Sequence, residues 1–371
     1  MKILFLPLFI FFSGIVFSQG STISGEITGF KDGVEVLLGD SDLGDIIQKS
    51  TIQKDRFRFN NPAKFSPKRM YMVIKEDTTM YWFNEFYIDT KNVFFSGAKR
   101  DIPNYIKIEG SKSNDEKIAF KKSYEKFQNK WDSINDLIAK KKSDTLKYKK
   151  EEIDNDRAKR SKICEQIENI KIESIKSNPN RYIALLELFW LKEKIGKEEV
   201  RKLYNQLNDN LKKSDFGLNL KVYLDLEKVL QEGDSFQDFQ AKDSNGIDHK
   251  ISEYKGKYIL LDFIQTYCYA CVLSNDELKK INEKYKNEVQ IITFCNDKSE
   301  KTWSDGYKEH QIQWISLWNG EGNYGRINQL YGTEGTPTFI LINPDGKIIK
   351  KEYGYGEGNL EVILKDVLDK K

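Results

Sequence analysis

The sequence predicts a chain of three structural regions, of which the last is an α/β domain. From about residue 234 to 371, strand and helix patterns alternate and end in a hairpin and a helix, which is typical of a βαβ unit joined to a ββα unit. Short alternating runs between turn residues predict a β-rich N-terminal domain, a small sandwich or open barrel, over residues 21–110. A helical period predicts a helical spacer over residues 113–231.

The composition supports folded cores and excludes one class of partner. Apolar residues make up 39% and aromatic residues 13% of the 371 residues, which is enough for two or three domains. Lysine and arginine total 60, against 57 aspartate and glutamate residues. Since no large basic excess is present to neutralise phosphates, nucleic acid is not expected as a main partner.

Residues 1–18 have the pattern of a secretory signal peptide. Met1 and Lys2 form a short positive region, an apolar run follows, and small residues near Ser18 suit cleavage after that residue. The apolar run is shorter than the roughly 20 residues that a spanning helix needs, and an uncleaved anchor is the alternative. We therefore expect export to the periplasm or cell envelope, where disulfides persist.

Each region is expected to contain the following elements. Strands of the β-rich domain are predicted at residues 22–28, 34–38, 56–59, 70–75, 80–88 and 92–95. In the spacer, an apolar stripe from Phe120 to Ile138 predicts a packing face on one helix. The charged stretch 140–162 predicts a solvated helix or an extended arm. Further helices are expected at residues 182–191, 198–211 and 218–230. The last domain is expected to have strands at 258–264, 290–294, 314–317, 338–342 and 347–353, and helices at 274–285, 299–307, 325–331 and 360–368.

The motif Cys268-Tyr269-Ala270-Cys271 lies between a predicted buried strand and a predicted helix. Two cysteines three residues apart on the first helical turn can form a disulfide with little backbone movement. The helix dipole and the free N–H groups of the first turn favour the thiolate of Cys268. A strand, a CxxC motif and a helix in this order predict a redox-active thiol pair.

Two other interpretations of the motif remain open. A structural zinc site needs four ligands, but His249 and His310 are far apart in sequence and Cys164 and Cys295 are single. No metal site is therefore expected, and nothing implies an organic cofactor. A purely structural disulfide is the second alternative, because secreted proteins use such bonds.

Three further blocks of sequence accompany the motif. The first block, residues 233–257, contains Gly233-Asp234-Ser235-Phe236 and Asp243-Ser244-Asn245-Gly246. The second is Leu261-Asp262-Phe263. The third contains Gly335-Thr336-Pro337-Thr338-Phe339 and Asn343-Pro344-Asp345-Gly346. With them, residues 234–371 resemble the TlpA/ResA group of thioredoxin-fold thiol–disulfide oxidoreductases, which is related to the AhpC/TSA family. Residues 21–230 resemble, more loosely, the uncharacterised N-terminal domain and helical spacer of bacterial envelope proteins. Tyr267 and the dipeptide Tyr269-Ala270 depart from the group, which usually has Trp before the first cysteine and often Pro between the two.

The resemblance implies a role for each residue of the site. Cys268 is expected to attack a substrate disulfide, and Cys271 to resolve the mixed disulfide. Asp262 lies where thioredoxins have a buried acid, so its pKa should be raised and it could accept the proton of Cys271. A solvent-facing carboxylate at the strand end is the alternative for Asp262.

Four residues are expected to contact the substrate. Pro337 is expected to follow a cis peptide bond, which would expose the backbone of Thr336 for strand-like pairing with a peptide. Tyr267 and Tyr269 flank Cys268 and are expected to line a substrate groove. The isolated Cys295 is expected to be inert.

The resemblance implies protein disulfides or dithiols as substrates, and it favours a reductant. Apocytochrome c and other envelope thiols are the substrates that it suggests, with a membrane thiol carrier as electron donor. A thiol peroxidase is one alternative, although Gln265 and Leu261 stand where peroxiredoxins have Thr or Ser and Pro. A binding or scaffold protein with a passenger thioredoxin domain is the other.

Overall fold

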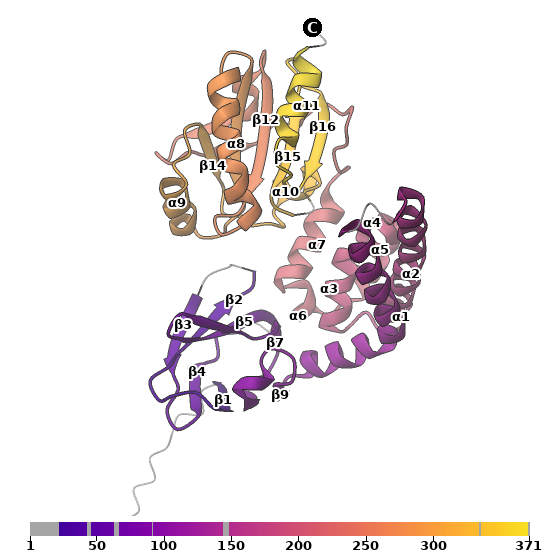
Figure 1. The fold of residues 1–371 in the computed structure, drawn as a ribbon, viewed down its shortest axis with the longest axis vertical. Helices are drawn as coiled ribbons and strands as arrows, with labels where there is room; N and C mark the ends of the chain where they lie inside the picture. The colour runs from indigo at the N-terminus through magenta and orange to yellow at the C-terminus, as the bar shows by residue number, and fades with distance from the viewer. Residues whose placement is uncertain are drawn as a thin grey trace, which may run out of the picture.

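The computed structural model describes residues 22–42, 46–62, 67–90, 92–143, 148–333 and 335–369. The predicted signal peptide lies outside these residues. A β-rich region, a helical region and an α/β domain follow one another along the chain, and the helical region lies beside the other two (Figure 1). Among the described residues, no helix has both the length and the apolar character that crossing a membrane requires.

The β-rich region consists of two sheets around one apolar core. One sheet has the strand order β4-β1-β8-β9, and the other has the order β3-β2-β5-β6 with β7 paired to β5. Residues of both sheets, such as Ile23, Val36, Phe86 and Phe95, share the buried cluster between them. The strands are β1 (Thr22–Thr28), β2 (Glu35–Asp40), β3 (Ile46–Thr51), β4 (Arg56–Asn60), β5 (Lys68–Glu76), β6 (Thr79–Trp82), β7 (Phe86–Ile88), β8 (Asn92–Ala98) and β9 (Lys107–Glu109).

The predicted β-rich fold is confirmed, but three of its details differ. The single strand expected at 80–88 is wrong, because residues 83–85 interrupt it and its two halves, β6 and β7, pair with different parts of β5. The strands β3 and β9 were not expected. Both have polar or charged residues at most positions and no fully buried side chain, so alternation does not reveal them.

The helical region is confirmed as helical, and its charged stretch forms part of a helical hairpin. The single solvated helix or arm expected at 140–162 is wrong: α1 (Lys112–Ser143) and α2 (Lys150–Ser177) are separate helices that pack against each other. Lys141 of α1 pairs with the buried Asp156 of α2 at 2.6 Å, which joins the two helices. The shorter helices are α3 (Tyr182–Trp190), α4 (Lys192–Ile195), α5 (Lys197–Gln206), α6 (Asp209–Lys212) and α7 (Asp215–Asp225).

Capping residues explain where the later helices begin. Asn208 caps α6 through a bond from the Leu211 N–H at 3.0 Å, so the helix expected at 198–211 is divided in two. Ser214 caps α7 in the same way, and α7 therefore begins and ends earlier than the expected range 218–230.

The α/β domain contains one seven-stranded sheet in the order β11-β10-β14-β13-β12-β15-β16. The central strands β12, β13 and β14 are parallel, and β15 and β16 are antiparallel. Its elements are β10 (Gln240–Lys242), β11 (Asp248–Lys250), β12 (Tyr258–Ile264), α8 (Tyr269–Tyr285), β13 (Val289–Cys295), α9 (Glu300–Glu309), β14 (Ile315–Trp318), α10 (Arg326–Tyr331), β15 (Thr338–Ile342), β16 (Ile348–Tyr353) and α11 (Asn359–Leu368).

Alternation on the central strands divides the core of this domain into two layers. Leu260 and Ile264 of β12 belong to the layer that also contains Cys271 of α8 and Leu360 of α11. Ile259, Leu261 and Phe263 of β12 belong to the opposite layer, which α10 covers. The strand at the centre of the sheet is therefore buried on both faces, as its continuous apolar run predicts.

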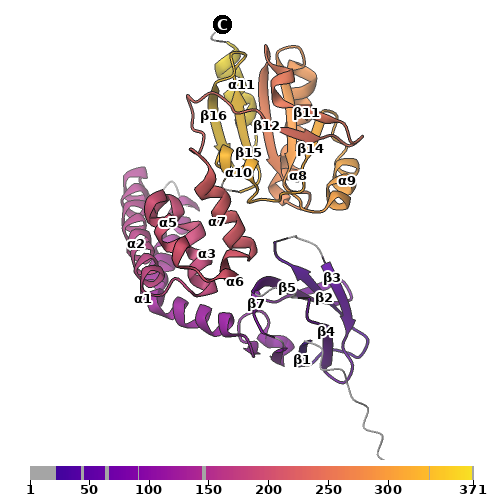
Figure 2. The same cartoon turned by 180° about the vertical axis from the view of Figure 1, so that it is seen from behind.

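Tyr324 joins the α/β domain to the helical region. Its ring contacts that of Phe189 with centroids 5.1 Å apart, and it also packs against Phe216. Arg69 of the β-rich region lies over the Phe216 ring at 5.0 Å. All three regions thus meet around α7, which leads into the α/β domain (Figure 2).

Candidate active site

Cys268 occupies the N-cap position of α8, directly after the loop that follows β12. The N–H of Cys271 donates to the Sγ of Cys268 at 3.3 Å. The first N–H groups of a helix have no partner within the helix, so a sulfur at this position receives a hydrogen bond that stabilises negative charge. The first turn of α8 thus favours the thiolate of Cys268 when the pair is reduced.

Cys268 and Cys271 form a disulfide, with their Cα atoms 5.2 Å apart. Cys268 is half-buried, whereas Cys271 is buried beneath the helix. A substrate can therefore reach only the first sulfur. Among the described residues, no group of three or more His, Cys, Asp or Glu side chains is arranged to hold a metal ion.

The peptide bond between Thr336 and Pro337 is cis, as the sequence predicts. The carbonyl oxygen of Thr336 lies 3.4 Å from the Sγ of Cys268. Pro337 leads directly into β15, which pairs with β12. The two strands therefore bring the disulfide and the Thr336 backbone together from positions 68 residues apart.

Asp262 lies on β12 between Leu260 and Ile264, on the face of the sheet that α8 covers. It is 1% exposed, so the alternative of a solvent-facing carboxylate is wrong. Burial raises the pKa of Asp262 to about 7, although the Thr293 hydroxyl, which donates to Oδ2 at 2.9 Å, opposes part of this rise. The carboxyl group can therefore exchange a proton near neutral pH.

Tyr267 and Tyr269 flank the disulfide and are 73% and 77% exposed. On the first turns of α8, the apolar side chains of Val272 and Leu273 are also exposed. An aromatic and aliphatic surface therefore surrounds Cys268. Such a surface can bind apolar segments of a polypeptide next to the reactive sulfur.

A set of contacts that the sequence did not predict fixes the loop before Cys268. The N–H of Thr266 donates to Asp297 Oδ2 at 3.1 Å, and His310 Nε2 donates to the Thr266 carbonyl oxygen at 3.0 Å. Gly306 of α9 packs so closely on Thr266 that a Cβ there would lie 2.4 Å from the threonine Cγ2. A glycine in the middle of a helix was the one sequence signal of this contact.

Cys295 lies at the end of β13 and is buried. Its thiol donates to Asp297 Oδ2 at 3.1 Å. Burial raises the pKa of this thiol well above its ordinary value, and the nearby Asp297 carboxylate adds to the rise. A buried, protonated thiol is a poor nucleophile, in agreement with the expectation that Cys295 is inert.

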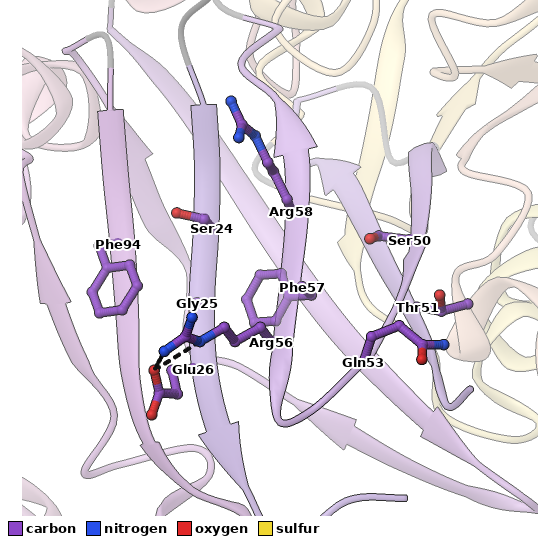
Figure 3. A pocket seen from close by; sticks show the side chains of 10 residues that line it. All are labelled: Ser24, Gly25, Glu26, Ser50, Thr51, Gln53, Arg56, Phe57, Arg58 and Phe94. Carbon is purple, nitrogen blue, oxygen red and sulfur yellow. Dashed lines mark hydrogen bonds and ion pairs between the residues drawn. The ribbon is translucent and has the colours of Figure 1, made fainter. Parts of the chain in front are cut away.

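The β-rich region contains a hollow of about 540 Å³ (Figure 3). Residues of β1, β3 and β4 line it together with Gln53 and with Phe94 of β8. Arg56 and Glu26 form an ion pair of 3.0 Å within it. No cysteine or histidine is among its lining residues. The lining of this hollow therefore supplies no thiol for a redox reaction.

Comparison with known proteins gives separate matches for the two ends of the chain. Residues 256–348 match a family model described as thioredoxin-like, and residues 21–117 match a domain of unknown function, DUF4369. The thiol–disulfide oxidoreductase ResA of Bacillus cereus is 27% identical over 148 residues, which are 39% of this chain and 83% of that protein. Human nucleoredoxin is 29% identical over 126 residues, which cover 32% of this chain and 27% of nucleoredoxin.

Solved structures are also similar to the α/β domain. A putative thiol:disulfide interchange protein DsbE of Chlorobium tepidum is 25% identical, with a TM-score of 0.35, and covers 38% of this chain and 97% of its own. A thiol–disulfide oxidoreductase of Bacteroides fragilis is 25% identical, with a TM-score of 0.34, and covers 36% of this chain and 99% of its own.

The fold and the family match define the C-terminal domain as thioredoxin-like. The ResA relatives show that this domain is similar to thiol–disulfide oxidoreductases. The protein thus combines a thioredoxin-like domain, similar to thiol–disulfide oxidoreductases, with an N-terminal domain of unknown function.

Proposed function

We propose that the protein reduces disulfides of other proteins in the cell envelope, with Cys268 and Cys271 as its reactive pair. The observation that carries the proposal is the position of the disulfide. Its half-buried sulfur lies at the start of α8 and 3.4 Å from the Thr336 carbonyl oxygen, while its second sulfur is buried. This asymmetry suits an attacking thiol and a resolving thiol.

The reaction transfers two electrons from the dithiol to the substrate. The Cys268 thiolate attacks a sulfur of the substrate disulfide, which forms a mixed disulfide and releases the other substrate sulfur as a thiolate. The Cys271 thiolate then attacks the Cys268 sulfur, so the Cys268–Cys271 disulfide forms and the second substrate thiolate leaves. Asp262 takes the proton of Cys271 in this step, because its pKa of about 7 lets it accept a proton near neutral pH.

Substrate binding is assigned to the surface around Cys268. A peptide lies in extended form along the backbone of Thr336 and Pro337, which gives affinity with little sequence preference. The exposed rings of Tyr267 and Tyr269 contact apolar side chains beside the cystine. Unfolded or flexible segments of envelope proteins, apocytochrome c among them, meet these requirements.

Location and electron supply complete the proposal. The signal-peptide pattern of residues 1–18 supports export to the periplasm or cell envelope. A reductant in that compartment must be reduced again after each turnover. A membrane thiol carrier supplies the two electrons by attacking the Cys268–Cys271 disulfide.

The proposal is tested by trapping the mixed disulfide. Cys271→Ser in the exported protein should accumulate disulfide-linked partners that run as larger species on non-reducing gels and disappear with reductant. Cys268→Ser should trap none, and Cys295→Ser in the Cys271→Ser background should trap as many as Cys271→Ser alone. Equal trapping by Cys268→Ser and Cys271→Ser would contradict the assigned roles.

A further inference from the structure

Three buried polar side chains form a row across the centre of the sheet. Asp262 of β12 is the register partner of Thr293 of β13, and Thr293 is the partner of Ser316 of β14. All three are at most 3% exposed and lie on the face that α8 covers. A polar row in this otherwise apolar layer is costly unless its members are hydrogen-bonded.

Two tryptophans supply these hydrogen bonds. Trp314 Nε1 donates to the Thr293 hydroxyl at 2.8 Å, and Trp303 Nε1 donates to the Ser316 hydroxyl at 3.0 Å. An indole N–H is only a donor, so the Thr293 oxygen accepts from Trp314. The hydroxyl hydrogen of Thr293 is then directed to Asp262 Oδ2, which lies 2.9 Å away.

The other oxygen of Asp262 is left free. Oδ1 is buried and has no hydrogen-bond partner among the described residues. Titratable groups lie on neighbouring elements. Cys271 of α8 is in the disulfide, and Cys295 lies on β13 two residues after Thr293, the register partner of Asp262. Glu352 of β16 is separated from Asp262 by Phe339 of β15, which pairs with both residues. Burial and the hydrogen bond from Thr293 are the causes that shift the pKa of Asp262.

We infer that Thr293 and Trp314 are positioning residues that set the pH at which Asp262 exchanges its proton, through a fixed hydrogen bond to Oδ2. Oδ1 is then the oxygen that receives the proton of Cys271. In this series of hydrogen bonds from Trp314 through Thr293 to Asp262, a neutral hydroxyl stabilises the carboxylate, and no cation is needed. This inference rests on the proposed function of Asp262 as the proton acceptor.

The experiment measures the titration of Asp262 directly in the oxidised full-length protein, by ¹³C NMR of its carboxyl carbon. Thr293→Val removes the donor but keeps the shape, and it should raise the titration midpoint by at least about one pH unit, since a hydrogen bond to a charged group is lost. Trp314→Phe should raise the midpoint by a few tenths of a pH unit, because the hydroxyl is no longer oriented and polarised. Thr293→Ser, which keeps the hydroxyl, should restore most of the original midpoint.

The second indole–hydroxyl pair of the row provides the matched control. Ser316→Ala removes a buried hydroxyl at the adjacent register position, which bonds to Trp303 and not to Asp262. The Asp262 midpoint should not move in this variant. A midpoint that moves equally in Ser316→Ala and Thr293→Val would overturn the inference, because the effect would then reflect general disturbance of the layer.

A separate readout distinguishes failure of the inference from failure of the proposed function. In the pH profile of disulfide reduction, the step at the Asp262 midpoint, as distinct from the ionisation of Cys268, should shift upward in Thr293→Val by the same amount as the midpoint and should vanish in Asp262→Asn. An unchanged midpoint in Thr293→Val overturns the inference alone. A profile that keeps its step in Asp262→Asn overturns the role of Asp262 as proton acceptor, and the inference with it.

Discussion

The buried carboxyl group of Asp262 should make the protein less stable at high pH. Burial raises the pKa of Asp262 from 3.8 to about 7. At pH values between these two pKa values, Asp262 keeps a proton in the native state that it has lost in the unfolded state, so the free energy of unfolding falls as the pH rises. The full difference corresponds to about 4 kcal/mol, and it is reached once the pH exceeds 7.

Asp262→Asn removes the ionisation and keeps the size of the side chain. Changes in packing and hydrogen bonding contribute equally at every pH, so the variation with pH isolates the charge. From pH 5 to pH 8.5, we expect the wild-type protein to lose about 3 kcal/mol of unfolding free energy relative to the variant.

The assay is urea unfolding of both oxidised proteins at pH 5, 6, 7 and 8.5, followed by circular dichroism. The slope of unfolding free energy against urea must be the same for both proteins, so that the midpoints can be compared. Other titrating groups are common to both proteins and cancel. A difference that stays constant within about 0.5 kcal/mol over this range would refute the raised pKa of Asp262, since one pH unit of altered titration is worth about 1.4 kcal/mol.

Two further predictions concern the active-site loop and the helical core. Asp297→Ala removes the acceptor of the Thr266 N–H, which costs about 1–3 kcal/mol for a buried donor, so disulfide exchange measured by stopped-flow fluorescence should slow. Asn208→Ala, which removes the cap of α6 in the helical region, should not change the exchange rate. Leu185→Ala should lower the free energy of unfolding by about 2–5 kcal/mol in urea titrations without changing the redox potential, because Leu185 is fully buried in the helical core. A slowed exchange in Leu185→Ala would show that this core also shapes the site.

The sequence predicted the parts of the site that depend on local pattern. The run from Tyr258 to Ile264 is apolar at all but one position, so a buried strand followed by the CxxC helix was evident. The cis bond before Pro337 and the buried acid came from the resemblance to thioredoxin-fold proteins. These features are local in sequence, and each has a characteristic residue pattern.

Other parts of the structure depend on pairing between distant residues. The contact of Trp314 with Thr293 joins residues 21 apart, and neither has a sequence pattern that separates a hydrogen-bonding role from packing. The α1–α2 hairpin was missed because the charged stretch hides a helix end near Ser143. The strand β3 was missed because it is polar and lies at a sheet edge, where burial does not impose alternation.

The redox role of Cys268 and Cys271 is tested most directly by a glutathione redox titration of the protein, with alkylation and mass spectrometry of the two cysteines. We expect a reversible disulfide between these two thiols, with a potential near the roughly −270 mV of thioredoxin. A potential near the roughly −120 mV of DsbA would contradict the proposed direction of electron transfer. If the two thiols form no reversible disulfide with each other, the redox function itself is contradicted, and the N-terminal region would then carry the function.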